Sequence, residues 1–472
     1  TNHDPFFPLL LSAEHTLLFP LLNKAPPLIQ ARDEGAPAVE VRASGVTLQG
    51  FVVRGGSAGV RVEGRQRVRL VDNAFAQGST GVWVSGGQDV WVKSSRFSHL
   101  DGAGVGVEGA QGVRVLANRF DNVGAGVRLG GETTRSLVRG NAFRNAAGGA
   151  RVLDGSPGNA LTDNQVVSGA GARLSDSPGT VMRSNRLAGG PEAFWVEANE
   201  VAGYDQDIDP SNRLGGRPIL YIEGLKGRPL KPGLQVGFLA LIGVEGVEVP
   251  QLRAAGGPLG ALVVASKDVR IVQASVSGAR AGVVVVASQG VVLSDSQITD
   301  SLTHGVALRD TEGVEIVRTS VAKSGGHGVY AQGVENLSVR ESDVFFNQGS
   351  ALWLDGVSVG RVSDNVLSDN GQYAVLLRGA RGLTFEHNRI TGNQTGFHLL
   401  GAQGNVVADN QIQGNQFGIF LERASGNTIT GNLITLNPRG GIQGELGDNQ
   451  VEGNLEDAGD DAEQDAEPQD DP

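Results

Sequence analysis

Arginine and tryptophan recur at one position of a regular spacing in the first half of the chain. The position lies between two apolar residues in stretches such as "GVRV" and "GVWV", and the interval of about 22 residues marks a repeat. A guanidinium pairs with carboxylate or sulfate through two hydrogen bonds, and an indole can stack on a sugar ring. These residues predict a face for an acidic glycan, with arginine merely solvating a strand as the alternative. They are Arg61, Trp83, Arg128, Arg151, Arg173 and Trp195, with Gly106 at the same spacing, and Arg69, Trp91 and Arg114 repeat the theme nearby.

The same position is uncharged in the second half of the chain. A monomer rarely exposes a long apolar stripe, so we expect a partner protein, self-association or an insert to cover it. The full series is Leu262, Val284, Ala307, Tyr330, Trp353, Leu376, His398, Phe420 and Gln443, and the candidate interface is Tyr330, Trp353, Leu376, His398 and Phe420.

Two sets of residues could bind a metal ion. Asp205, Asp207 and Asp209 have a spacing that can supply three oxygen ligands to calcium, although Gly216 at the twelfth position excludes an EF-hand loop. His304 and His327 are one repeat apart and are expected to stack about 4.8 Å apart, where they could share a metal ion. The alternatives are solvated turn carboxylates and ordinary corner residues, because no third His, Met or Cys follows the two histidines.

The repeat itself predicts the fold. Asparagines such as Asn365, Asn388 and Asn410 recur at the same interval, and each unit holds three short runs of alternating apolar residues between Gly/Asn corners. Such units cannot bury an apolar face alone and must stack. We predict an all-β chain: a single right-handed parallel β-helix of about sixteen to seventeen coils, with corner asparagines bonded in ladders.

The spacing is interrupted once, which divides the chain. We expect an irregular N-terminal cap or first coil (1–38), N-terminal coils (39–203), a β-hairpin insert (204–236), C-terminal coils (237–454) and an acidic disordered tail (455–472). An uncapped apolar end would aggregate, so the segments before Val39, or another subunit, should close the N-terminal end.

The coils together with "DIDPSNRLGGRPILYI" resemble the right-handed parallel β-helix repeat proteins, in particular the NosD-like periplasmic copper-binding and surface group. Arg217 and Leu220 depart from that pattern, which has Lys and Tyr there. The resemblance implies the fold and suggests copper for the histidine pair, but this fold hosts many activities. The matching residues are Ile208, Asp209, Asn212, Gly216, Pro218, Ile219 and Tyr221.

Composition limits the function classes. The net charge is -12, but the final stretch "EDAGDDAEQDAEPQDDP" carries nine Asp or Glu and no Lys or Arg. The body is therefore nearly neutral, and nucleic acid is not an expected partner. The chain has no Cys and no apolar run long enough to span a membrane. We expect export to the periplasm or cell surface, with any signal peptide absent from this chain.

The leading interpretation is a non-enzymatic structural or ligand-presenting module of the cell envelope that makes protein contacts. The alternatives are a protein that binds or modifies an acidic polysaccharide, like a lyase or epimerase, and a copper-handling accessory protein. Enzyme chemistry is less favoured because no Asp/Glu cluster aligns with the arginine column. No cofactor is expected; calcium is the first alternative and copper the second.

Overall fold

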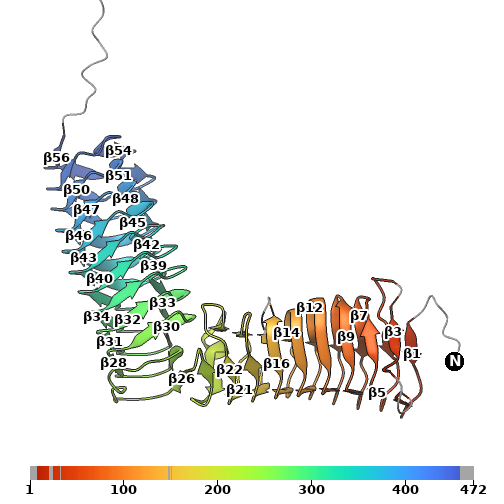
Figure 1. Cartoon of the computed structure of the whole chain (residues 1–472). Coiled ribbons are helices and arrows are strands. Elements are labelled where there is room, and N and C mark those ends of the chain that lie inside the picture. Colours follow the sequence, from red (N-terminus) through yellow and green to blue (C-terminus); the bar gives the residue numbers. More distant parts are fainter. Residues whose placement is uncertain (1–7, 21–24, 32, 147–148, 150, 458–472) are drawn as a thin grey trace, which may run out of the picture. The chain divides into compact units, whose positions relative to one another are not determined.

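The computed structural model describes residues 8–20, 25–31, 33–146, 149 and 151–457. It confirms an all-β parallel solenoid, with about nineteen turns of about 22 residues (Figure 1). Within the described residues the one helix is the short 3₁₀ turn η1 (Val201–Tyr204). The acidic tail lies outside the described residues apart from its first three.

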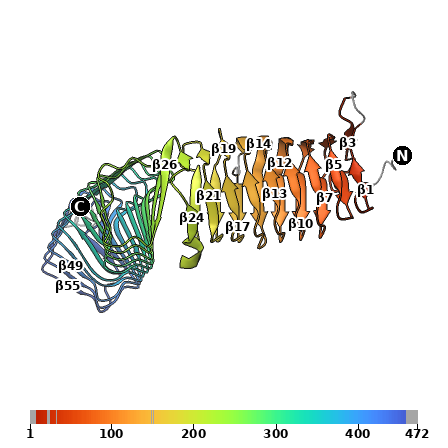
Figure 2. The same cartoon turned by 90° about the horizontal axis from the view of Figure 1, so that it is seen from below.

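The chain divides into two compact units. Unit 1 comprises residues 1–223, 235–242 and 256–258, and unit 2 comprises residues 224–234, 243–255 and 259–472. Figure 2 views unit 1 from below, where β13 and β21 belong to one sheet with β15 and β18 between them. The nine strands of this sheet are β2 (Leu17–Leu18), β5 (Thr47–Gln49), β8 (Arg69–Val71), β11 (Trp91–Lys93), β13 (Arg114–Leu116), β15 (Leu137–Arg139), β18 (Ala160–Thr162), β21 (Thr180–Arg183) and β24 (Gln206–Ile208).

Two further sets of strands complete the coils of unit 1. One set carries the Arg/Trp position: β1 (Leu9–Leu11), β4 (Val39–Val41), β7 (Ala58–Glu63), β10 (Thr80–Ser85), β12 (Arg96–Glu108), β14 (Arg119–Gly130), β17 (Arg151–Asp154), β20 (Ala172–Ser175) and β23 (Phe194–Glu197). The other comprises β3 (Leu28–Gln30), β6 (Val52–Arg54), β9 (Ala74–Gly78), β16 (Ala142–Ala146), β19 (Gln165–Val166), β22 (Arg186–Leu187) and β25 (Arg213–Leu214), with β12 and β14 extending into it.

The coil count exceeds the sixteen to seventeen expected from the asparagine spacing because coils form without asparagine. Near the N-terminus β1 pairs with β4, β2 with β5 and β3 with β6, all in parallel, so these three strands already belong to one coil. The inward apolar residues and the ladder bonds suffice to stack a coil, and asparagine adds to them.

Segment 204–236 differs from the expected protruding hairpin. Its β24 and β25 extend the sheets of β21 and β22 in parallel, and thus form part of another coil. A tight turn at Gly215 and Gly216 then reverses the chain, so that β26 (Arg217–Glu223) pairs antiparallel with β25 and parallel with β27 (Phe238–Ile242). Both glycines have positive φ, which explains their place at this turn.

Unit 2 is more regular than unit 1. One sheet has ten strands from β28 (Glu248–Pro250) to β55 (Gln450–Glu452), and another has ten from β29 (Arg253–Ala255) to β56 (Leu455–Glu456). The third set carries the uncharged column: β30 (Leu259–Val264), β33 (Ala281–Val286), β36 (Val306–Arg309), β39 (Val329–Gln332), β42 (Leu352–Asp355), β45 (Tyr373–Arg378), β48 (Thr395–Leu400), β51 (Phe417–Glu422) and β54 (Ile442–Gly444).

Equivalent side chains stack inside the coils. In unit 1, Phe75, Phe97, Phe120 and Phe143 form a continuous stack with ring centroids 4.7 to 4.8 Å apart. Buried asparagines form ladders at the corners, and in each step one amide donates to the side-chain oxygen of the next, as Asn388 Nδ2 does to Asn410 Oδ1 at 2.9 Å. These ladders confirm a structural role for asparagine.

Candidate functional site

The predicted acidic-glycan face of unit 1 forms a ladder with one register change. Arg61, Trp83, Gly106 and Arg128 face one another on successive strands, as their spacing predicts. On the next strand, Arg128 lies opposite Val152. Arg151 lies opposite Val127 instead. Placing Arg151 in this column was therefore wrong, because one extra residue enters the coil before the column position is reached.

Several charged and aromatic groups on this face contact one another. Arg61 lies 3.8 Å from Glu63, and Arg173 donates to Glu197, which also accepts a bond from Trp195 Nε1 at 2.8 Å. A Cβ at Gly106 would lie 2.6 Å from the ring of Trp83, so the indole already covers the backbone there. The arrangement favours a solvated, self-paired strand surface over a glycan platform.

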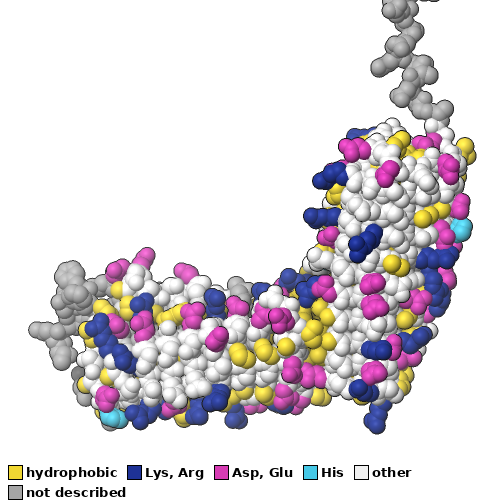
Figure 3. Space-filling model, turned by 180° about the vertical axis from the view of Figure 1, so that it is seen from behind, with side chains coloured by type: hydrophobic (Ala, Val, Ile, Leu, Met, Phe, Trp, Pro, Cys, Tyr) yellow, Lys and Arg dark blue, Asp and Glu magenta, His cyan; other side chains and the backbone are white. Residues whose placement is uncertain are grey.

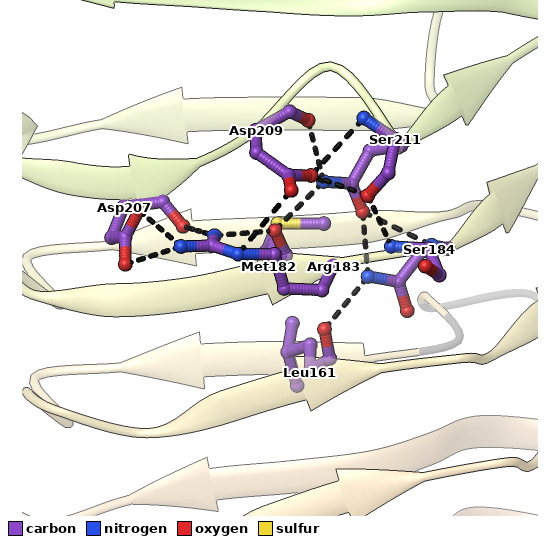
Figure 4. Close-up of polar contacts among 9 residues, drawn as sticks. Leu161, Met182, Arg183, Ser184, Asp207, Asp209 and Ser211 are labelled. Atoms are coloured by element: carbon purple, nitrogen blue, oxygen red, sulfur yellow. Dashed lines mark hydrogen bonds and ion pairs between the residues drawn. The ribbon is translucent and has the colours of Figure 1, made fainter.

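Two of the three candidate calcium carboxylates, those of Asp207 and Asp209, contact an arginine. Arg183 Nη2 donates to both oxygens of Asp207 at 2.5 Å, and Arg183 Nε lies 3.4 Å from Asp209 (Figure 4). Asp209 also accepts the backbone N–H of Ser211 at 3.1 Å. A cation at this place would have to displace the guanidinium, so the arrangement gives calcium binding no support.

His304 and His327 stack as predicted, with ring centroids 5.2 Å apart and planes 3° apart. Each Nδ1 accepts a backbone N–H, from His327 at 3.1 Å and from Ser350 at 2.9 Å respectively. Parallel rings direct their remaining nitrogens side by side, whereas one metal ion needs ligands that converge at about 2.0–2.1 Å. Sharing an ion would require a ring to turn and give up its backbone bond.

Burial keeps these imidazoles neutral. Burial, and then the neighbouring His304, lowers the pKa of His327 to about 4. Protonation at Nδ1 would also oppose the N–H of Ser350, so the folded chain disfavours the charged form. Because the folded pKa lies below the unfolded value near 6.5, this group contributes stability above pH 6.5 that is lost as the pH falls towards 4.

We therefore predict that His327 titrates with a midpoint near pH 4 in an NMR pH titration of the folded protein. A His327 midpoint at or above 6 would contradict the packing described above.

The uncharged column of unit 2 has the register that its spacing predicts, from Leu262 to Gln443. Its side chains are less exposed than an open stripe would be. Leu376 is only 3% exposed, and the ring of Trp353 lies 4.5 Å from that of His327 between centroids. His398 packs between Tyr373 and Phe420, at 5.1 and 5.3 Å. The rings cover one another, which reduces the need for a protein partner.

A groove of about 690 Å³ opens over the middle of this column. Its floor is Trp353, Leu376 and His398, with Tyr373 at the start of the strand that carries Leu376. Arginine and amide side chains line the remainder, and the lining includes two guanidiniums and no carboxylate. These lining residues are Gln372, Arg378, Gln394 and Arg423, with Leu400 and Gly401.

The ion pairs around the groove leave Arg378 most available. Arg378 lies 4.0 Å from Asp355, whereas Arg423 is bonded to Glu422 at 2.9 Å. His398 Nε2 lies 3.3 Å from Glu422, and the pKa of His398 is lowered by burial despite this carboxylate. Arg378, with a side chain 59% exposed, therefore presents the freest positive charge in the groove.

Sequence reasoning found the floor but not the lining. Gln372 and Gln394 follow the asparagine corners of successive coils, and Arg378 lies two positions beyond the column on the same strand face. Because strand residues i and i+2 share a face, the position of Arg378 could be derived from the sequence. The sequence could therefore have predicted the outward position of Arg378. It could not have predicted that Arg378 and Tyr373 line the same groove.

The stacked coils define the class of protein: a parallel β-solenoid that presents side chains in columns. A family model described as "Right handed beta helix region" matches residues 37–187 and 304–455, more than half of the chain. The chain belongs to this right-handed β-helix family, and the predicted handedness is confirmed.

Solved structures resemble the chain at the level of fold. A point mutant of the periplasmic alginate epimerase AlgG shares 12% identity and a TM-score of 0.43, over 75% of this chain and 77% of that one. The Dettilon tailspike protein has 14% sequence identity and a TM-score of 0.36, over 75% of this chain and 62% of that one. DFA-IIIase from Arthrobacter chlorophenolicus A6 also has 14% sequence identity and a TM-score of 0.36, over 65% of this chain and 82% of that one. No curated protein matches the sequence.

Metal clusters and membrane spans are absent from the described part of the chain. Within it, no three His, Asp or Glu side chains are grouped closely enough to hold a metal ion. Among the same residues, no helix has the length and apolarity to cross a membrane.

Proposed function

We propose that this chain is a non-enzymatic, ligand-presenting β-helix that binds a short stretch of an acidic saccharide in the groove of unit 2. The observation that carries the proposal is the composition of the groove, which has an aromatic floor at Trp353 and Tyr373, the arginine Arg378, and the amides of Gln372 and Gln394.

Each part of the groove matches one part of a uronic-acid ring. The apolar C–H face of a sugar can lie on the indole and phenol rings, as amphipathic aromatic side chains allow. The exposed guanidinium of Arg378 can pair with a carboxylate through two hydrogen bonds. Carboxamides donate to and accept from hydroxyl groups. Stacking and polar contacts then act on the same ligand.

A protein partner over the column remains the alternative from the sequence. Its support is the partial exposure of Tyr330 and Phe420, which lie outside the groove. The resemblance to the NosD-like group would add copper, but the parallel histidine rings do not converge on an ion, so we do not extend the proposal to copper. A location outside the cytoplasm would suit an acidic polysaccharide ligand, and we include it in the proposal.

The test is titration calorimetry with a tetramer of galacturonate. We expect Arg378→Gln to weaken binding about tenfold, because a charge-assisted hydrogen bond contributes about 1.5 kcal/mol. Arg389→Gln, an equal loss of charge on another sheet of unit 2, should leave the affinity unchanged. Absent binding by the natural sequence, or equal weakening by both variants, would overturn the proposal.

A further inference from the structure

A second charged surface lies on unit 1, on the sheet that contains β8, β11, β13 and β15. We call residues 67–71, 89–93, 112–116 and 135–139 the basic face; they occupy four successive coils. Figure 3 shows Lys and Arg side chains following one another along the lower edge of this unit, where Figure 1 places β5 and β21. The cations of the basic face are Arg67, Arg69, Lys93, Arg114, Arg135 and Arg139, and Asp89 is its one carboxylate.

A stack of three side chains organises the centre of the basic face. Arg69 and Arg114 face Trp91 on the two neighbouring strands, and their guanidinium carbons lie 4.4 and 4.8 Å from its ring centroid. The indole is therefore covered on both faces by cations. Such contacts hold a guanidinium in place without neutralising it.

Asp89 anchors this stack from one side. It accepts a bond from Arg69 Nη2 at 2.7 Å and one from Trp91 Nε1 at 2.7 Å. Burial alone would raise the pKa of Asp89, but these bonds and the charges of Arg69 and Arg114 hold it below the usual value. The single carboxylate thus stays ionised and is occupied by Arg69, while Arg114 rests on the other face of the indole.

Most of the remaining cations are free to bind an anion. Arg139 pairs with Asp163 at 3.1 Å. Within the part of the chain that the structure describes, Arg67, Lys93, Arg114 and Arg135 have no ion-pair partner. In the neighbouring Arg/Trp column, Arg61 and Arg173 each lie beside a carboxylate, whereas Arg128 forms no ion pair with any described residue. The basic face therefore presents these four unpaired cations on four successive coils, although the chain as a whole is acidic.

We propose that the basic face binds an anionic polysaccharide through charge, as a site separate from the groove of unit 2. The unpaired cations lie in three adjacent columns of the sheet, with Arg67 and Arg135 in one, Arg114 in the next and Lys93 in the third. On coils spaced about 4.8 Å apart they form a band of positive charge, which suits the repeated anionic groups of a polymer. Both faces of Trp91 are already covered, so neither a sugar nor a nucleic-acid base can stack there. Binding by charge alone is strongly salt-dependent, unlike stacking in the groove.

The experiment measures binding of the full chain to dextran sulfate against salt concentration, with uncharged dextran of the same length as control. Each neutralised contact contributes about 0.7 to 0.9 to the slope of log K against log salt. The double variant Arg114→Gln with Arg135→Gln should reduce the slope by about 1.4 to 1.8. A matched variant, Arg119→Gln with Arg173→Gln, has the same loss of charge at ion-paired positions and should change the slope by less than half as much.

The outcomes separate this site from the groove. Arg114→Gln with Arg135→Gln should leave the affinity for the galacturonate tetramer unchanged, because both residues lie outside the groove. The basic face can therefore fail while the groove proposal holds, and the groove proposal can fail while the basic face holds. Equal slopes for both double variants would overturn the proposal, as would equal retention of uncharged dextran. Binding of single-stranded poly-dT through Arg114 and Arg135 at equal affinity would also overturn it, since the ligand would then be nucleic acid. Thermal melting of each variant checks that the fold is intact.

Discussion

Replacing Trp353 with alanine is expected to weaken binding of an acidic oligosaccharide by about ten- to a hundredfold. The indole forms much of the groove floor, and burying such a side chain contributes about 1.5 to 3 kcal/mol. Trp353→Phe should retain most of the affinity because the ring against His327 is kept. Calorimetry with the galacturonate tetramer measures both variants.

The control for this result is Trp195→Ala. That indole lies in unit 1 and is held by Glu197, so its removal should leave the affinity unchanged. Sedimentation of the same samples tests the competing interpretation. If the natural sequence is an oligomer and Trp353→Ala is a folded monomer with unaltered saccharide binding, the column is a protein interface and the groove proposal fails.

Replacing Asn388 with leucine is expected to destabilise unit 2 by about 2 to 5 kcal/mol, because buried donors lose their acceptor. Asn388 Oδ1 accepts two hydrogen bonds from Asn365, one from the backbone N–H at 3.1 Å and one from the side-chain Nδ2 at 2.9 Å. Asn388 Nδ2 donates to Val362 O at 2.8 Å. Leucine has nearly the same size but accepts nothing, so two buried donors of Asn365 would lose their partner. Each such loss costs about 1 to 3 kcal/mol.

Urea denaturation measures this change, with Asn454→Leu as the matched control. Asn454 ends the same ladder, where it accepts from Asn432 but is itself only half-buried. We expect the control to lose less than half as much stability. Similar losses of stability for the two variants would contradict this expectation, because the ladder would then contribute no more stability in the middle of unit 2 than at its end.

In unit 2 the repeat spacing was enough to predict which side chains lie opposite one another on neighbouring strands. The spacing predicted the correct neighbours from Leu262 to Gln443, because parallel strands in a solenoid must place equivalent residues opposite one another. The fold class followed from the same period, since short alternating runs cannot bury their apolar residues except by stacking. The stack of His304 on His327 was predicted for the same reason.

The same reasoning failed where a corner changed length. At Arg151 one extra residue moved the ladder by one position, and a shift of one residue exchanges the two faces of a strand. Segment 204–236 contains the antiparallel pair expected of a hairpin, but its first strands belong to a coil and not to an insert. The spacing concealed this coil because Asn212 continues the asparagine ladder 27 residues after Asn185. Local corner geometry depends on contacts with the coils on both sides, and one sequence does not report them.

The sequence by itself determined the period, the strands, the asparagine ladders and the order of side chains along each column, all of which follow from one repeating interval. Only the tertiary structure decided which of these columns is available to a ligand. Arg173 is hydrogen-bonded to Glu197, whereas Arg114 rests on the ring of Trp91 and Arg378 lies 4.0 Å from Asp355 with 59% of its side chain exposed. The physical reason is that availability depends on distances of a few ångströms between side chains of different columns, and spacing along the chain fixes position within a column but not those distances.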